Sequence, residues 1–268
     1  MLFAILAAAA MASPALGQAP APATAKPAPG PVKRMADGTP DIQGMFMADA
    51  GGANYGLERR TGDALTPPAR GVVVDPPDGK LPMQPWAVAE VASRALPERG
   101  YDDPTAHCFV AGVPRSMYVP SPMQILQPTG YVVILHERMS WRIIPLGKTH
   151  TLPDNVRLWQ GDSVGRWEGD TLVIETKNLN GKTWLNEAGE IVSHAETVVE
   201  RFIPVNADRI RYEATVTDPL VYTRPWTIGV NFNRQADGEL LEVACLEDDE
   251  DAKHLKDIKD AARATEKK

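Results

Sequence analysis

Four polar side chains in the second half of the chain have the chemical types that proton transfer requires. They are Arg142, His194, Glu200 and Tyr212. A histidine or a carboxylate can move a proton, while an arginine stabilises the negative charge that develops on an enolate or a carboxylate. If a barrel brings these side chains to its mouth, they would form a catalytic site. Ion pairing of Glu200 with an arginine of the neighbouring strand explains the same residues without catalysis.

A metal site is a second possibility. His194 and Glu196 lie two residues apart on a predicted strand, so their side chains would face the same side. His136 or His150 could then complete a zinc or iron site from a second strand. The five histidines are scattered, however, and contain no paired histidine motif. A polar outer face of an edge strand explains this pattern better, so we expect no bound metal and no other cofactor.

A serine nucleophile has weaker support. Ser163 lies in a Gly-x-Ser-x-Gly segment at residues 161–165, a spacing found at the nucleophile turn of many hydrolases. That turn needs a strand before it and a helix after it. Here a Trp-Glu-Gly-Asp turn and another predicted strand follow. The sequence also lacks a phosphate-binding glycine loop and a dinucleotide fingerprint.

Aromatic side chains give the clearest binding signal. Those on or beside predicted strands are Tyr131, Trp141, Trp184, Tyr212 and Trp226. A closed barrel of about eight strands has room for one small ligand, and such pockets are mostly apolar. Core packing explains any single tryptophan. Several together, each near an arginine or a glutamate, favour an inward-facing pocket for a small hydrophobic or aromatic molecule.

These side chains would be positioned by a series of short strands. Strands are predicted at 131–137, 141–146, 193–204, 209–217, 225–234 and 239–246, with two more inside 165–176. At 209–217, apolar residues alternate with charged ones, which is typical of a sheet with one buried face. Short links make successive strands antiparallel, and a meander of this length must close or stack to hide its edges. We expect a mainly β fold, an antiparallel up-and-down barrel, with a sandwich as the alternative.

The segment before these strands is predicted to be irregular. Turn signals crowd residues 35–104, and the one helix candidate is Pro85–Leu96, with proline suited to its first turn. This segment has too little apolar content for a core of its own. We therefore expect a single domain at 35–247, in which a long N-terminal wrap covers the barrel. The charged residues 248–268 are predicted to form a short C-terminal helix or tail.

The N-terminus resembles an export signal. Residues 2–16 are almost entirely apolar, and Ala15-Leu16-Gly17 has small residues at the positions that a signal peptidase recognises. We expect cleavage after Gly17, a Pro/Ala-rich linker at 18–34, and a periplasmic or secreted mature protein. In an oxidising compartment the two cysteines, Cys108 and Cys245, are candidates for a disulfide. Two buried free thiols are the alternative.

Composition excludes several classes of protein. The net charge of −7 disfavours nucleic-acid binding, which needs clustered Lys and Arg. The sequence has no apolar run of the roughly 18 residues that an integral membrane segment needs. The leading hypothesis is an exported barrel that binds a small hydrophobic or aromatic molecule. The alternatives are a cofactor-independent lyase, isomerase or hydratase acting by acid–base catalysis, and an envelope interaction module.

The segment Gly161-Asp-Ser-Val-Gly-Arg-Trp-Glu-Gly-Asp-Thr-Leu-Val-Ile-Glu-Thr176 resembles a family of exported bacterial proteins. Further similar stretches are Asp37–Gly44, Cys108–Arg115, Trp141–Leu146, Lys182–Leu185, Val199–Phe202, Arg211–Thr215 and Thr223–Trp226. Together they cover most of residues 37–245. The resemblance implies export and a calycin-like β architecture. It implies no reaction and no site residues.

Overall fold

One antiparallel sheet dominates the computed structural model of the protein. The structure describes residues 30–62, 67–96, 99, 102–138, 140–243, 245, 256–257 and 260. The predicted signal segment and most of the predicted linker lie outside these residues, as does nearly all of the predicted C-terminal helix. Among the described residues, no helix has the length and apolar character needed to cross a membrane.

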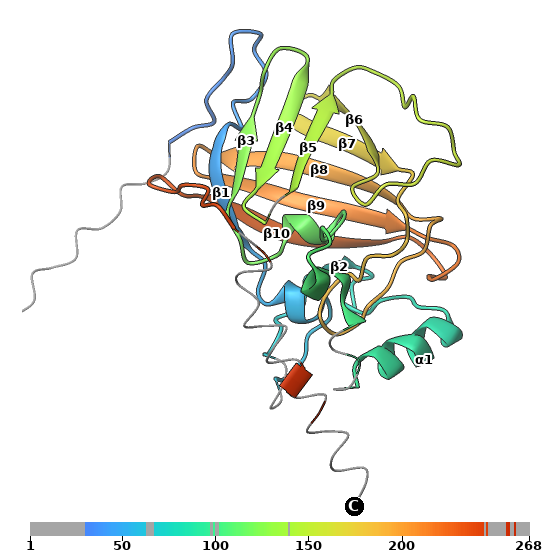
Figure 1. Cartoon of the computed structure of the whole chain (residues 1–268). Helices are drawn as coiled ribbons and strands as arrows, with labels where there is room; N and C mark the ends of the chain where they lie inside the picture. Colours follow the sequence, from blue (N-terminus) through green and yellow to red (C-terminus); the bar gives the residue numbers. More distant parts are fainter. Residues whose placement is uncertain are drawn as a thin grey trace, which may run out of the picture.

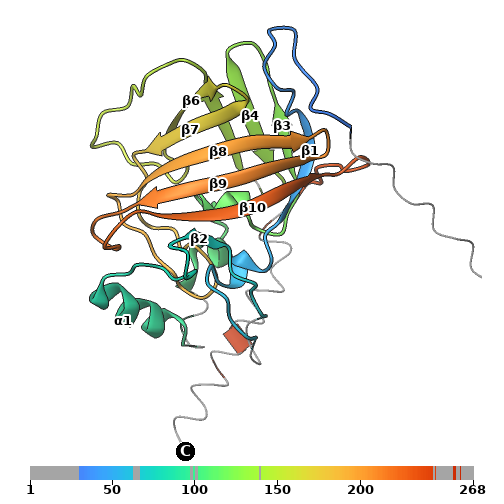
Figure 2. The same cartoon turned by 180° about the vertical axis from the view of Figure 1, so that it is seen from behind.

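Nine strands follow each other around the sheet in the order β5-β4-β3-β1-β10-β9-β8-β7-β6, and the short β2 pairs with β10 (Figures 1 and 2). Their bounds are β1 Gly44–Asp49, β2 Val73–Asp75, β3 Met123–Leu126, β4 Tyr131–His136, β5 Ser140–Pro145, β6 Asp162–Glu168, β7 Thr171–Lys177, β8 Thr197–Asn206, β9 Arg209–Thr217 and β10 Trp226–Arg234. All the strand pairs are antiparallel. The prediction of a mainly β, antiparallel barrel is confirmed.

The sheet nearly closes on itself where β5 meets β6. An isolated parallel bridge joins Leu146 to Gly165, and the Gly147 N–H donates to the Gly165 carbonyl over 2.8 Å. A Cβ atom on Gly165 would lie 2.9 Å from Leu146 Cδ2 and 3.1 Å from Ile144 Cγ2. The absence of a side chain at Gly165 therefore lets the two ends of the sheet approach.

Side-chain alternation places the core inside the barrel. In β9 the buried row is Ile210, Tyr212, Ala214 and Val216, and in β10 it is Trp226, Ile228, Val230 and Phe232. Both rows match the predicted inward faces. The opposite choice would bury the charged row of β9 without partners. The register of β9 against β10 sets these two rows side by side, for example Tyr212 opposite Val230.

The N-terminal wrap contributes more to the barrel than its sequence predicts. β1 was not predicted, yet it lies between β3 and β10 and joins the hairpins of the β3–β5 half to those of the β6–β10 half. The strand order therefore departs from chain order at this point. Conversely, the sequence predicts a strand at 239–246, but residues 239–243 do not form a strand.

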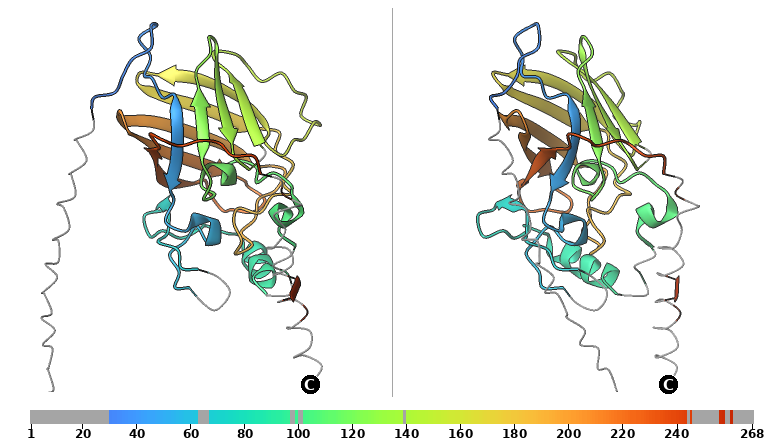
Figure 3. Two further views of the ribbon diagram at one scale, coloured as in Figure 1. Left: turned by 60° about the vertical axis from the view of Figure 1, so that its left-hand side comes forward. Right: turned by 90° about the vertical axis from the view of Figure 1, so that its left-hand side faces the viewer.

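The part of the wrap that follows β1 gathers at one end of the barrel, which we call the wrapped end (Figure 3). It contains the helix α1, Pro85–Arg94, and short 3-10 helices at Ala53–Tyr55, Pro104–His107 and Arg115–Met117. α1 begins at the predicted Pro85 and ends two residues before the predicted Leu96. It docks on the loop between β9 and β10, where the Trp86 indole N–H donates to the Leu220 carbonyl over 3.1 Å.

A disulfide ties the wrap to the segment after β10. Cys108 and Cys245 are bonded, with their Cα atoms 5.8 Å apart. The predicted disulfide is thus confirmed. It joins two parts of the chain that lie outside the barrel strands.

Candidate functional site

A buried ion pair crosses the inside of the barrel. Arg142 on β5 and Glu200 on β8 are both inward-facing and almost fully buried. The guanidinium contacts the carboxylate with both Nη atoms, over 2.8 Å to Oε1 and 2.5 Å to Oε2. Burial opposes the charge on Arg142, but the charge and hydrogen bonds of Glu200 outweigh it and raise the pKa of the guanidinium.

Three further side chains complete this central cluster, which we define as Arg142, Ser163, Thr176, Glu200 and Tyr212. The Tyr212 hydroxyl donates to Glu200 Oε1 over 2.9 Å, and Arg142 Nη2 donates to the hydroxyls of Thr176 and Ser163, each over 3.1 Å. Burial, and then the Glu200 charge, raise the pKa of Tyr212 well above its ordinary value. The structure therefore brings together three of the four predicted catalytic residues.

His194, the fourth predicted catalytic residue, is placed elsewhere. It lies in a turn before β8 and is exposed, whereas Glu196 two residues later is buried. The prediction that these two side chains share one strand face is wrong, because β8 begins only at Thr197. His150, one of the histidines considered for a metal site, instead pairs with Asp162 over 3.0 Å. The described residues contain no group of three or more His, Cys, Asp or Glu that could hold a metal ion.

Of the five predicted pocket aromatics, Tyr212 belongs to the central cluster, and two others lie on the outer surface of the barrel. Tyr131 is 44% exposed and Trp141 is 64% exposed, since both fall on the outward parity of β4 and β5. The expectation that Tyr131 lines the interior is therefore wrong. The inward positions of these strands belong instead to Val132, Ile134, His136, Ser140, Arg142 and Ile144.

The other two predicted aromatics are buried toward the wrapped end. Trp184 follows β7 in a loop, and the Arg94 guanidinium of α1 lies over its ring at 5.1 Å. Trp226 begins β10 on the inward face, with its ring 5.2 Å from that of Tyr222. Trp184 therefore contacts the wrap, and of these two tryptophans only Trp226 belongs to the barrel wall.

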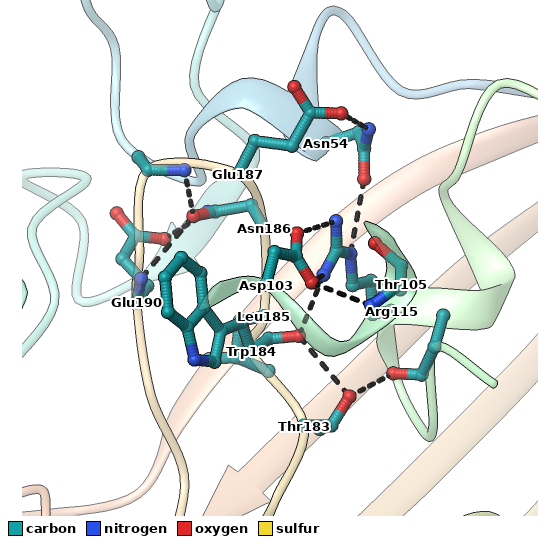
Figure 4. A network of polar contacts seen from close by, with 12 residues as sticks. Asn54, Asp103, Thr105, Arg115, Thr183, Trp184, Leu185, Asn186, Glu187 and Glu190 are labelled. Atoms are coloured by element: carbon teal, nitrogen blue, oxygen red, sulfur yellow. Dashed lines mark hydrogen bonds and ion pairs between the residues drawn. The ribbon is translucent and has the colours of Figure 1, made fainter. Parts of the chain in front are cut away.

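A second buried ion pair holds the wrap in place (Figure 4). Arg115 and Asp103 form two contacts, of 2.9 and 2.8 Å, and Arg115 Nε donates to the Asn54 side-chain oxygen over 3.1 Å. Asn54 in turn donates to Glu187 over 2.7 Å. This network joins three separate parts of the chain and has a structural role. No sequence pattern predicts this network.

Glu190 is a buried carboxyl at the same end of the barrel. Its carboxylate accepts from the Asn186 side chain over 2.5 Å and from the Leu57 backbone N–H over 3.2 Å. Burial raises its pKa from 4.5 to about 7, because these two hydrogen bonds only partly offset the cost of removing the charge from water. Glu190 is thus a buried acid that titrates near neutral pH.

Several buried polar atoms at the wrapped end and inside the barrel have no partner among the described residues. They are both carboxyl oxygens of Glu196, Trp226 Nε1, Arg142 Nε, His136 Nε2 and Ser116 Oγ. Buried polar atoms are nearly always paired, so such atoms mark sites where a ligand or solvent completes the contacts. His136 is neutral there, because burial and the nearby Arg142 charge lower its pKa to about 3.

Sequence analysis missed Glu196 as an acid–base candidate. The only sequence feature that points to a buried Glu196 is its spacing of two and four residues from Val198 and Glu200, which places it on the same face of the strand. Comparisons of the chain with protein-family models, with curated proteins and with solved structures find no match. The candidate site is therefore defined by geometry: an apolar barrel interior that holds one satisfied ion pair and several unpaired polar atoms.

Proposed function

We propose that this protein is an exported barrel that binds a small hydrophobic or aromatic molecule in its interior. The observation that carries the proposal is the set of unpaired polar atoms in an otherwise apolar interior. Ligand sites in barrels combine apolar walls with a few polar groups that orient the ligand. Glu196, Trp226 and Arg142 supply such groups here.

The central cluster favours binding over catalysis. Both oxygens of Glu200 are held by Arg142, and one of them also accepts from Tyr212. Neither oxygen of a carboxylate held in this way is open to a substrate, because reaching one would mean breaking a buried ion pair. The cluster instead fixes the distance between β5 and β8 across the interior. Binding therefore remains the leading function, ahead of acid–base turnover and of an envelope interaction module.

The experiment is a fluorescence titration with the neutral probe N-phenyl-1-naphthylamine. Ala214 is buried in the inward row of β9, so Ala214→Phe fills the interior and should weaken probe binding at least tenfold. Val199→Phe is the matched control, because Val199 faces outward on β8 and the same ring added there should leave the affinity unchanged. If Ala214→Phe does not fold, Ala214→Val adds a smaller side chain to the interior. Equal probe affinity in the native protein, the Ala214 variant and Val199→Phe would contradict an interior site.

Export is part of the same proposal. The disulfide supports it, because such bonds persist mainly in oxidising compartments. The apolar segment at residues 2–16 supports it from the sequence. N-terminal sequencing of the protein from its native cells should begin near Gln18. A mature protein that still carries Met1 would refute this part of the proposal. It would also contradict the export that the resemblance to exported proteins implies.

A further inference from the structure

Two carboxyl groups face each other at the wrapped end of the barrel. The pairing of β8 with β9 sets Thr197 opposite Thr217 and Val198 opposite Val216. One step beyond the strands, the same register brings Glu196 opposite Asp218. Both side chains are almost fully buried. Among the described residues, the two buried arginines, Arg115 and Arg142, pair with Asp103 and Glu200 and not with this carboxyl pair.

The two carboxyls differ in their partners. Asp218 accepts the Ser193 backbone N–H over 2.5 Å, the Ser193 hydroxyl over 2.8 Å and the Leu220 N–H over 3.1 Å. These three donors occupy both oxygens of Asp218. Neither carboxyl oxygen of Glu196 has a partner among the described residues. Burial, and then the Asp218 charge, raise the pKa of Glu196 well above its ordinary value, which favours the protonated carboxyl with an O–H that can donate.

A second unused donor lies at the same end. Trp226 is fully buried, and its Nε1–H, which can only donate, has no partner among the described residues. The ring of Trp226 packs on Tyr222, whose phenol lies near both Glu196 and Asp218. The Tyr222 hydroxyl itself donates to the Ile191 carbonyl over 2.8 Å. Tyr222 therefore offers a ring face, while Glu196 and Trp226 offer donors.

These donors select the chemistry of the ligand. A bound cation could pair with Glu196 but would leave the Trp226 N–H without an acceptor. An oxygen acceptor on an apolar molecule satisfies a donor and fits the aromatic surroundings. We propose that the wrapped end of the barrel binds an apolar or aromatic carbonyl compound whose oxygen atoms accept from the Glu196 carboxyl and the Trp226 indole. This inference rests on the proposed binding function and adds the class of ligand.

The test compares acetophenone, a carbonyl compound, with ethylbenzene, which has the same shape without the oxygen. Isothermal titration at equilibrium should show acetophenone binding about tenfold more tightly, the ratio that about 1.4 kcal/mol of hydrogen bonding produces. Glu196→Leu should reduce this preference, because only the Trp226 indole then donates to the carbonyl oxygen. Glu196→Gln should retain much of it, because the amide still donates. Both variants should fold, since each removes a buried carboxyl that faces Asp218, and Glu196→Met is available if leucine does not fit.

The carbonyl stretch of bound acetophenone gives an independent readout. Donation to the carbonyl oxygen lowers its infrared frequency, so the band should shift down in the native protein and move back in Glu196→Leu. Equal binding of acetophenone and ethylbenzene would overturn the ligand class and leave the binding function intact, provided that the naphthylamine probe still binds. Preferential binding of benzylamine, lost in Glu196→Gln, would also overturn it in favour of a cation. Binding of none of these compounds, including the probe, would overturn both proposals.

Discussion

Arg142 and Glu200 carry charges inside the barrel, and their contacts with each other offset the cost of removing these charges from water. Arg142→Met leaves Glu200 buried and unpaired, and we expect it to lower the free energy of unfolding by about 3–5 kcal/mol. The double variant Arg142→Met/Glu200→Leu should recover most of this loss, because it removes both charges. Urea unfolding monitored by circular dichroism measures each value.

The matched control is Arg166→Met. Arg166 forms equally short contacts with Glu168 and Glu175, but on the outer surface, where water screens the charges. Its loss should change the unfolding midpoint very little. Equal effects of Arg142→Met and Arg166→Met would show that the central cluster does not stabilise the barrel.

Glu190 makes stability depend on pH. Its pKa is about 7 in the folded protein, against 4.5 ordinarily, so the folded state holds the proton more tightly. The stability contributed by protonated Glu190 is complete below about pH 4.5 and is lost as the pH rises through about 7. The loss amounts to about 3 kcal/mol, at 1.36 kcal/mol for each pKa unit.

The measurement is urea unfolding at pH 5 and pH 8. Glu190→Gln should remove this component, so the native protein should lose about 2.5 kcal/mol more than the variant between the two pH values, since a small part of the loss already falls below pH 5. Glu242→Gln, at an exposed position, should behave like the native protein. Parallel pH profiles for the native protein and Glu190→Gln would contradict the assignment.

Sequence patterns identify site residues only where a strand fixes their direction. Arg142, Glu200 and Tyr212 lie within predicted strands, so their parity set them inward together. His194 lies in the turn before the strand, where alternation does not apply, whereas Glu196 continues the inward parity of β8, so the prediction that both share one face is wrong. Pairing of Arg115 with Asp103 depends on how an irregular segment folds back, which no local pattern encodes.

At the scale of elements, the seam between β5 and β6 depends on Gly165. A Cβ atom at residue 165 would by itself lie 2.9 Å from a methyl group of Leu146 and 3.1 Å from one of Ile144. The larger side chain of Gly165→Val would therefore press on both residues. Overpacking of this kind costs about 1–3 kcal/mol. Thermal unfolding should show the loss, and Leu146→Ala in the same protein should restore part of it. Gly30→Val, in a more open position, serves as control.

Most strands were predictable because they alternate and are joined by tight turns. β6 and β7 flank the Gly169–Asp170 turn, and the predicted 209–217 coincides with β9. β1 and β3 were not predicted. β3 has only four residues, and β1 begins with glycine and contains no β-branched residue, so neither gives a clear local signal. Both become strands because the barrel offers them partners on each side.

At the scale of the whole molecule, the disulfide encloses every barrel strand from β3 to β10 in one covalent loop. Replacing Cys108 and Cys245 by serine should lower the free energy of unfolding by about 2–4 kcal/mol, chiefly because the unfolded chain becomes freer. Urea unfolding of this double variant should match that of the native protein in reductant. Identical midpoints for the oxidised native protein and the variant would refute a stabilising role.

The place of β1 in the barrel also determines when this strand can complete its pairing during synthesis of the chain. β1 leaves the ribosome before every other strand, but one of its two neighbours, β10, is the last strand to be made. Until then the edge of β1 that faces β10 has no hydrogen-bonding partner in its own chain, and an open edge of this kind can pair with other chains. The growing polypeptide therefore needs either protection by a chaperone or a delay in folding until translation is nearly complete.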